Sequence, residues 1–261
     1  MKRSFILLAS LLAASGAAAQ TVSDKAHVRF VAAGDLAGGV YRAAIVIDLA
    51  PDTLTYWRNP GDAGVPPTFD WKGSQNVAKA VVAMPAPKRI TEAGEDVFGY
   101  TGQVAYPVTI TPADPGKPVS ADLRMDYAAC EKICIPMHAD ASLTFAPDGK
   151  AGPDAPLVAA ALAATPKAAA AADAAKITPV AGAPKPTWRV EPKAAGASDL
   201  FAEAPDGYFF ETGKEPDGAF RLTMAEATQA APGLVPVRLT MPTAAGAIEF
   251  EVGLDAAGHK P

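Results

Sequence analysis

Short stretches in which apolar and polar residues alternate strictly are the feature that most limits how this 261-residue chain can fold. In one of them Leu123, Met125 and Tyr127 alternate with Arg124 and Asp126. Successive side chains of a strand point to opposite faces of a sheet, so a period of two residues is typical of a strand with one buried face. The pattern recurs at 104–110, 143–145, 220–224, 237–241 and 248–252. We therefore expect antiparallel sheets.

Turn-forming residues separate these stretches. The chain contains 25 prolines and 22 glycines, which suit short strands and turns better than long helices. The runs at 237–241 and 248–252 are joined by a short Thr-Ala-Ala-Gly turn, which predicts a hairpin. The run VYRAAIVIDL, from Val40 to Leu49, is rich in β-branched and apolar residues and predicts a further strand.

A change in composition divides the chain. Residues 151–186 are mostly alanine with scattered proline, lysine and aspartate, which favours an Ala/Pro-rich, partly helical linker. Strand patterns occupy 20–150 before it and 187–261 after it. We predict an all-β protein with two β-sandwich domains, the second smaller than the first.

The first residues predict export. Lys2 and Arg3 precede an apolar stretch, and Ala17-Ala18-Ala19 provides the small residues that signal peptidase requires. We expect residues 1–19 to be a cleavable signal peptide that sends the chain to the periplasm. No later apolar run approaches the roughly 20 residues that a membrane helix needs, so we expect no membrane insertion. Removal of Lys2 and Arg3 changes the formal charge from −5 to −7, which argues against a nucleic-acid partner.

Cys130 and Cys134 are the two cysteines of the chain. A disulfide needs Cα atoms within about 7 Å, whereas four residues of extended strand span about 13 Å. The chain must therefore turn between them, and the flanking strand patterns favour the tip of a hairpin. Spacing alone leaves open a structural staple in a non-redox binding scaffold and a redox-active pair. Lys132 would stabilise a thiolate and Glu131 would oppose it.

Copper binding is a further alternative. Cys130, Cys134, Met137 and His138 lie within nine residues, and thiolate and thioether ligands suit Cu(I). A thioredoxin fold is not expected, because the spacing is not Cys-x-x-Cys and no βαβ pattern surrounds the pair. Apart from this alternative, no residue pattern predicts a cofactor.

The motifs around the cysteines resemble a known family. The string YWRNPGDAG at 56–64, Pro66-Pro67, Asp70-Trp71 and the pattern Tyr-x-x-Cys-x-x-x-Cys-x-Pro at 127–136 are similar to the N-terminal periplasmic domain of DsbD-family thiol:disulfide interchange proteins. The resemblance covers about Val28 to Phe145 and is closest to the ScsB-like branch, which is linked to copper tolerance. Trp188 and Asp199-Leu200-Phe201 resemble the second domain of that branch.

This resemblance implies an immunoglobulin-like fold whose Cys130/Cys134 pair passes electrons to or from periplasmic thioredoxin-like partners through mixed disulfides, as a protein-disulfide reductase would. It favours Cys134 as the cysteine that forms them. The membrane-embedded domain of full-length relatives has no counterpart in this sequence. A separate membrane protein is therefore expected to donate the electrons.

The family also shields its cysteines with a mobile cap loop that bears an aromatic residue. Residues 95–100 lie at the matching place, with Phe98 as the cap candidate and Tyr100 as the second. A turn anchored by an apolar side chain is the alternative interpretation. The resemblance implies Tyr56 and Tyr127 as neighbours of the site.

Overall fold

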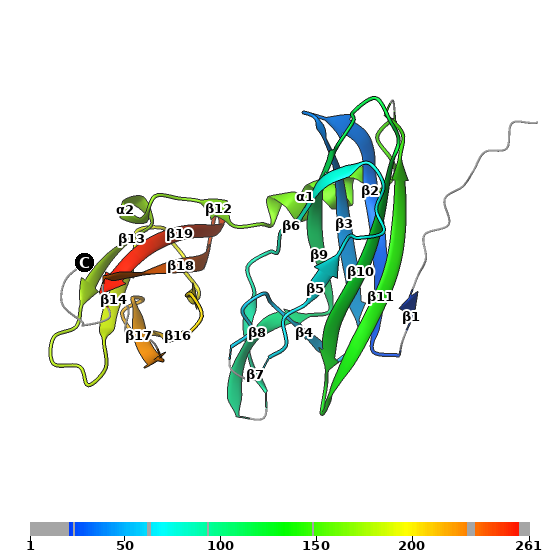
Figure 1. The fold of residues 1–261 in the computed structure, drawn as a ribbon. Coiled ribbons are helices and arrows are strands. Elements are labelled where there is room, and N and C mark those ends of the chain that lie inside the picture. The colour runs from blue at the N-terminus through cyan, green and yellow to red at the C-terminus, as the bar shows by residue number, and fades with distance from the viewer. Residues whose placement is uncertain are drawn as a thin grey trace, which may run out of the picture.

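The computed structural model describes residues 21–22, 24–61, 64–92, 94–147, 149–228 and 233–255. It confirms the all-β class and shows two sandwiches of the predicted immunoglobulin-like kind (Figure 1). The predicted signal peptide over residues 1–19 lies outside the described residues. No helix in the described part of the chain is long and apolar enough to cross a membrane.

The first sandwich has two sheets whose paired strands are antiparallel. One sheet has, in spatial order, β1 (Thr21–Val22), β2 (Ala26–Ala37), β3 (Val40–Leu49), β9 (Gln103–Pro112) and β6 (Val77–Val82). The other has β11 (Cys134–Phe145), β10 (Val119–Cys130), β4 (Leu54–Tyr56), β8 (Glu95–Thr101) and β7 (Lys88–Glu92), and β5 (Thr68–Asp70) also pairs with β10.

The core of the first sandwich follows the predicted alternation. Leu123, Met125 and Tyr127 of β10 are buried, whereas Arg124 and Asp126 on the same strand are exposed. Residues of β2, β3 and β9 from the facing sheet complete this apolar layer. Strands β10 and β11 remain paired from Val119 opposite Phe145 to the cysteines, so this long hairpin carries the pair at its tip.

The second sandwich is smaller and also has two sheets. One contains β12 (Lys167–Ala168), β19 (Gly246–Asp255), β18 (Leu234–Thr243) and β15 (Phe201–Glu203). The other contains β13 (Ala175–Pro179), β14 (Thr187–Pro192), β17 (Phe220–Ala227) and β16 (Tyr208–Lys214). The predicted hairpin is confirmed, since Thr243 pairs with Gly246 where β18 turns into β19.

The segment predicted as a linker is more structured than expected. Helix α1 (Ala155–Ala163) packs Val158 and Ala161 against Ala44 and Val46 of β3, on the face that points away from the main core. Small side chains on both surfaces allow this close approach, so few large apolar residues are needed. Helix α2 (Ala171–Ala174), β12 and β13 belong to the second sandwich, whose strands therefore begin before residue 187.

Candidate functional site

The two cysteines face each other where β10 ends and β11 begins. Cys130 and Cys134 are paired in the ladder, with their Cα atoms 4.0 Å apart, and a disulfide joins them. The amide of Glu131 donates to the carbonyl oxygen of Ile133 across the tip. The predicted hairpin tip is thereby confirmed.

The two cysteines differ sharply in exposure. Cys130 is fully buried, whereas Cys134 is exposed. Beside Cys134, Ile133 is 74% exposed and Ile135 is 37% exposed, so exposed apolar side chains flank Cys134 along the chain. A thiolate from another protein would therefore meet Cys134 before it met Cys130.

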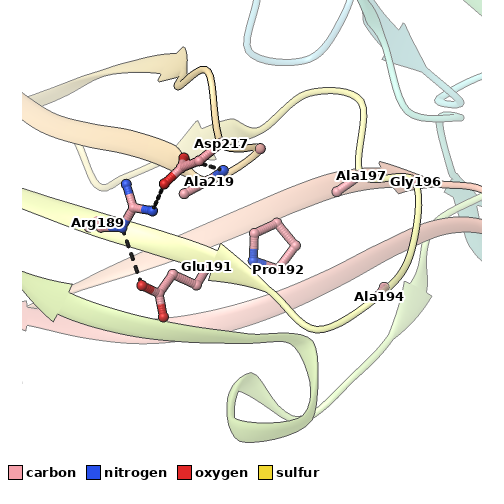
Figure 2. Close-up of a pocket in the computed structure, with 9 residues that line it drawn as sticks. Arg189, Glu191, Pro192, Ala194, Gly196, Ala197, Asp217 and Ala219 are labelled. Atoms are coloured by element: carbon pink, nitrogen blue, oxygen red, sulfur yellow. Dashed lines mark hydrogen bonds and ion pairs between the residues drawn. The ribbon is translucent and has the colours of Figure 1, made fainter.

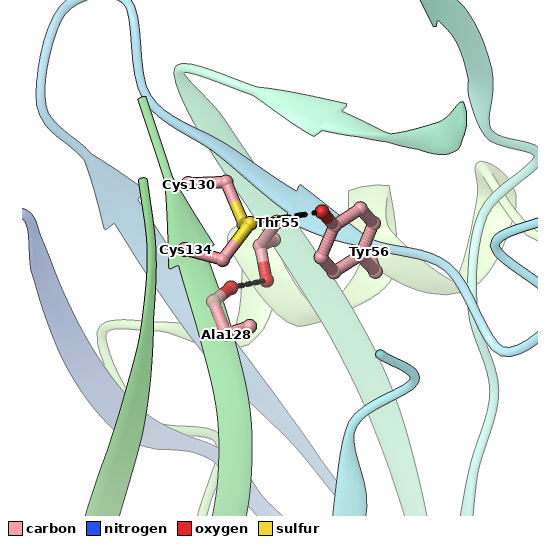
Figure 3. The surroundings of a disulfide bond; sticks show 5 residues. All are labelled: Thr55, Tyr56, Ala128, Cys130 and Cys134. Carbon is pink, nitrogen blue, oxygen red and sulfur yellow. Dashed lines mark hydrogen bonds between the residues drawn. A yellow bond between two sulfur atoms is a disulfide. The ribbon is translucent and has the colours of Figure 1, made fainter. Parts of the chain in front are cut away.

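Tyr56 places its hydroxyl group at both sulfur atoms. The oxygen lies 3.1 Å from Sγ of Cys130 and 3.2 Å from Sγ of Cys134. Disulfide sulfurs carry no hydrogen, so the hydroxyl is the donor. The Tyr56 side chain is itself buried, and Figure 3 shows its hydroxyl pointing at the disulfide.

Strand β4 holds Tyr56 in this position. Leu54 pairs with Cys130, and the Thr55 hydroxyl donates to the carbonyl oxygen of Ala128 at 2.8 Å (Figure 3). On its other side Tyr56 pairs with Gly99 of β8. A Cβ atom at Gly99 would lie 2.2 Å from the carbonyl oxygen of Thr55, so glycine is required for this close approach.

Residues 95–100, the predicted cap loop, form strand β8. The buried Val97 packs in one cluster with Leu54, Tyr56 and Cys130. Phe98, on the opposite phase of β8, packs in the main core with its ring centroid 5.0 Å from that of Phe201. Strand β4 and Val97 therefore provide the apolar cover of Cys130. No sequence pattern distinguished Val97 from its neighbours.

Tyr100 and Tyr127 are buried in the main core. The Tyr100 hydroxyl donates to the carbonyl oxygen of Pro85 at 2.7 Å, and burial raises its pKa well above the ordinary value. Burial also raises the pKa of Tyr127 to about 12. Among the described residues, the Tyr127 hydroxyl has no hydrogen-bond partner.

A charged pair flanks the tip of the hairpin. Lys25, which precedes β2, forms an ion pair with Glu131. Its hydrogen bond and positive charge lower the pKa of the Glu131 carboxyl group. The carboxylate expected to oppose a thiolate is thus balanced by a lysine more than 100 residues away, which the sequence did not indicate.

The four residues of the copper alternative do not converge. Met137 and His138 are neighbours on β11, so their side chains point to opposite faces. His138 lies between Asp126, at 2.7 Å, and Asp140, at 3.1 Å, while Met137 packs on the core. No group of three His, Cys, Asp or Glu residues in the described chain is arranged to hold a metal ion.

A hollow of about 300 Å³ in the second sandwich is lined by residues of β14 and the turns beside it (Figure 2). Arg189 at its edge pairs with Glu191 at 3.2 Å and also with Glu215 and Asp217. Three carboxylates thus surround one guanidinium group, which leaves no excess positive charge to attract an anion.

The first sandwich matches a known protein family. Residues 18–146 match the sequence model of the family described as thiol:disulfide interchange protein DsbD, N-terminal. Among curated protein sequences, none matches the chain.

Solved structures also match the chain. The N-terminal periplasmic domain of ScsB from Proteus mirabilis aligns with a TM-score of 0.71 and 17% identity, over 91% of this chain and 97% of that chain. The reduced N-terminal domain of DsbD from Neisseria meningitidis aligns with a TM-score of 0.28 and 13% identity, over 45% of this chain and 84% of that chain. The first likeness extends over both sandwiches and shows that their fold is shared.

Proposed function

Residues 18–146 belong to the family of DsbD N-terminal domains, and from this membership we propose that the chain is a periplasmic thiol–disulfide exchange protein that relays electrons through Cys130 and Cys134. The observation that carries the proposal is the disulfide between one buried and one exposed cysteine, with the Tyr56 hydroxyl at both sulfurs. A structural staple needs neither the difference in exposure nor the hydroxyl group.

The exchange proceeds by two thiolate attacks. A partner thiolate attacks Sγ of Cys134, a mixed disulfide forms, and the Cys130–Cys134 bond breaks with Cys130 leaving as a thiolate. The partner's second cysteine, as a thiolate, then attacks the sulfur of the partner's first cysteine in the mixed disulfide. This forms the partner's disulfide and releases Cys134. Two electrons and two protons have moved, so the partner is oxidised to a disulfide while both cysteines become thiols.

Tyr56 would assist the first attack. Negative charge develops on the leaving sulfur of Cys130, and a hydrogen bond to a charged atom is stronger than one to a neutral atom. The hydroxyl already lies 3.1 Å from that sulfur, so little reorganisation is needed. The reverse sequence of steps, with a reduced pair attacking a partner's disulfide, uses the same contacts.

The kind of partner is inferred from the family and from the exposed apolar residues beside Cys134. A thioredoxin-like protein in the periplasm would dock on the apolar residues beside Cys134, and a separate membrane protein would supply the electrons. The basic and apolar N-terminal residues support export to that compartment.

Reduction of the folded full chain tests the proposal. The protein is equilibrated without oxygen in dithiothreitol and glutathione buffers, free thiols are alkylated, and the reduced fraction is measured while circular dichroism monitors folding. We expect reversible reduction at a potential above about −300 mV, where exchange disulfides rather than resistant structural ones lie. A bond that opens only when the protein unfolds would contradict the proposal.

The scaffold alternative makes the opposite prediction. If the bond is a staple, the Cys130→Ser/Cys134→Ser variant would lose about 2 kcal/mol of stability, the value for a short closed loop, and keep its partners. The copper alternative requires tight Cu(I) binding to the reduced chain that is lost in His138→Ala. The opposite directions of Met137 and His138 do not favour it.

A further inference from the structure

Contacts between the two domains are concentrated on the chain segment that directly follows Tyr56. The amide of Trp57 donates to the carbonyl oxygen of Phe98 at 2.9 Å, which extends the pairing of β4 with β8. The Trp57 ring is fully buried, 5.8 Å from the ring of Phe201 in the second sandwich. The Asn59 side-chain amide donates to the carbonyl oxygen of Ala202 at 2.8 Å. Trp57 and Asn59, which follow the site residue Tyr56, thus both contact residues of the second domain.

Arg58 adds a charged link at the same place. Its guanidinium group binds both carboxylate oxygens of Glu203, at 2.8 and 2.6 Å, and also pairs with Glu249. The group stacks on Trp57, 4.6 Å from the ring centroid. Burial alone would lower the pKa of Arg58, but the two carboxylates outweigh burial and raise it. This bidentate geometry fixes orientation as well as distance.

Arg89 forms a second link, from the hairpin of β7 and β8. It binds both carboxylate oxygens of Asp199, at 3.1 and 2.9 Å, and donates to the Thr212 hydroxyl at 2.9 Å. Its guanidinium carbon lies 5.0 Å from the ring centroid of Phe98, with which it is paired in the ladder. Phe201, fully buried, belongs to the core of the first sandwich although it lies on β15. Figure 1 shows β7 and β8 on the side of the first sandwich that faces the second.

These contacts act on the cover of the buried sulfur. Trp57 and Arg58 continue β4, which carries Leu54 and Tyr56, and Phe98 is the neighbour of Val97 on β8. Leu54, Tyr56 and Val97 are three of the side chains that pack in one cluster with Cys130. The short strand β4 has only three residues, so its position depends on what holds its ends.

We propose that the second domain is a clamp which, through Arg58, Arg89 and Phe201, holds β4 and β8 over Cys130 and thereby directs attacking thiols to Cys134. Arg58 and Arg89 are positioning residues, because they act through Tyr56 and Val97 and touch neither sulfur. The clamp deepens the proposed function and rests on it, because shielding one sulfur matters only if the pair is reduced and reoxidised.

Relative labelling of the two cysteines tests the clamp. The full chain is reduced, treated briefly with N-ethylmaleimide at fixed pH, and digested with trypsin. Cleavage after Lys132 separates the peptide that holds Cys130 from the one that holds Cys134, so mass spectrometry gives both rates from one sample. Cys134 serves as the internal reference, because it is exposed with the clamp in place.

The test variants remove charges from the second domain only. Asp199→Asn and Glu203→Gln each delete one carboxylate that faces a clamp arginine, and the double variant deletes both. We expect each single change to raise the Cys130/Cys134 labelling ratio about threefold or more, and the double change to raise it further. Phe201→Leu provides an uncharged variant with the same expected direction.

The matched control is Asp217→Asn/Glu251→Gln, which has the same net charge and removes partners of Arg189 and Arg238 within the second domain. An unchanged ratio in the folded clamp variants would overturn the clamp, and so would an equal rise in the control. If the double variant unfolds, the labelling ratios of the two single variants are compared with the control in the same way. Failure of the disulfide to be reduced in the native chain would instead overturn the proposed function.

Discussion

The hydroxyl oxygen of Tyr56 lies 3.1 Å from Sγ of Cys130, and both residues are buried. No sequence spacing relates them, since they are 74 residues apart. Pairing of Leu54 with Cys130 brings β4 to the end of β10, and Gly99 lets β8 close on its other side. The contact is therefore a product of sheet topology.

Tyr56→Phe should slow reduction of the disulfide. The variant keeps the ring and its burial but removes the donor to the departing Cys130 thiolate. A hydrogen bond of about 0.5–1.5 kcal/mol corresponds to a rate about two- to tenfold lower. Stopped-flow measurement of reduction by dithiothreitol checks this.

Tyr127→Phe is the matched control for this change. Its hydroxyl group is also buried but has no hydrogen-bond partner among the described residues. Loss of an unsatisfied buried hydroxyl should leave the reduction rate unchanged and keep or raise stability. Equal slowing in both variants would mean that the Tyr56 hydroxyl has no specific role.

The single-cysteine variants should differ strongly in reactivity. Cys130→Ala retains the exposed Cys134 and should form mixed disulfides readily. Cys134→Ala retains only the buried Cys130 and should react at least about tenfold more slowly, because an inaccessible thiol is a poor nucleophile toward another protein. The probe is a thioredoxin-like protein whose second active-site cysteine is alanine, and non-reducing electrophoresis counts the trapped complexes. Faster trapping by Cys130 would reverse the assignment of the attacked sulfur.

Alternation predicted the core strands because it reports directly which face of a strand is buried. The burial of Leu123, Met125 and Tyr127 and the hairpin that turns at Thr243 follow from this rule. Strand β3 was also predicted, but its run of apolar residues lacks alternation. The reason is that both faces of this strand are buried, one against the main core and the other beneath α1.

The alanine-rich segment was harder to predict because alanine is compatible with linkers, helices and tightly packed surfaces alike. Contacts such as Arg89 with Asp199 were also beyond the sequence, because they join residues 110 positions apart on different domains. Local patterns contain no information on which loops of two sandwiches will meet. The cysteine pair itself was found because its chemistry is carried by residue type and short spacing.

Truncation of Val158 should show that α1 is part of the first domain. This side chain is only 1% exposed, beneath the helix and against β3. Val158→Ala removes the equivalent of two methylene groups and leaves a small cavity, so we expect the free energy of unfolding to fall by about 1.5–3 kcal/mol. Urea unfolding measures the loss, and Ala159→Ser, at an exposed position, should cost much less. A loss no larger than that of the control would indicate that α1 is only loosely attached.

The pKa of His138 should lie above the ordinary value for histidine. Its hydrogen bonds to Asp126 and Asp140 favour the protonated ring and raise its pKa. Its contribution to stability is therefore complete below the unfolded-state pKa and is lost as pH rises through the folded-state pKa. NMR titration of the ring should show the pKa falling in Asp126→Asn and in Asp140→Asn, and remaining unchanged in Asp122→Asn. If the pKa of His138 changes in neither Asp126→Asn nor Asp140→Asn, the exposed ion pairs are not maintained in solution.

The ion pair of Lys25 with Glu131 should tune the thiolate at the hairpin tip. In Lys25→Met the Glu131 carboxylate loses its counter-charge, so the negative field at Cys134 becomes stronger and thiolate formation less favourable. The pKa of the Cys134 thiol in the reduced protein should rise, by the small amount expected for charges near the surface. Ultraviolet absorbance of the thiolate as a function of pH measures the shift. Lys25→Arg should restore the original value, and Lys79→Met, on β6 of the other sheet, should leave it unchanged. The difference between Lys25→Met and the original chain should shrink in high salt, since exposed charges are screened. A shift of equal size in Lys79→Met would instead assign the effect to net charge.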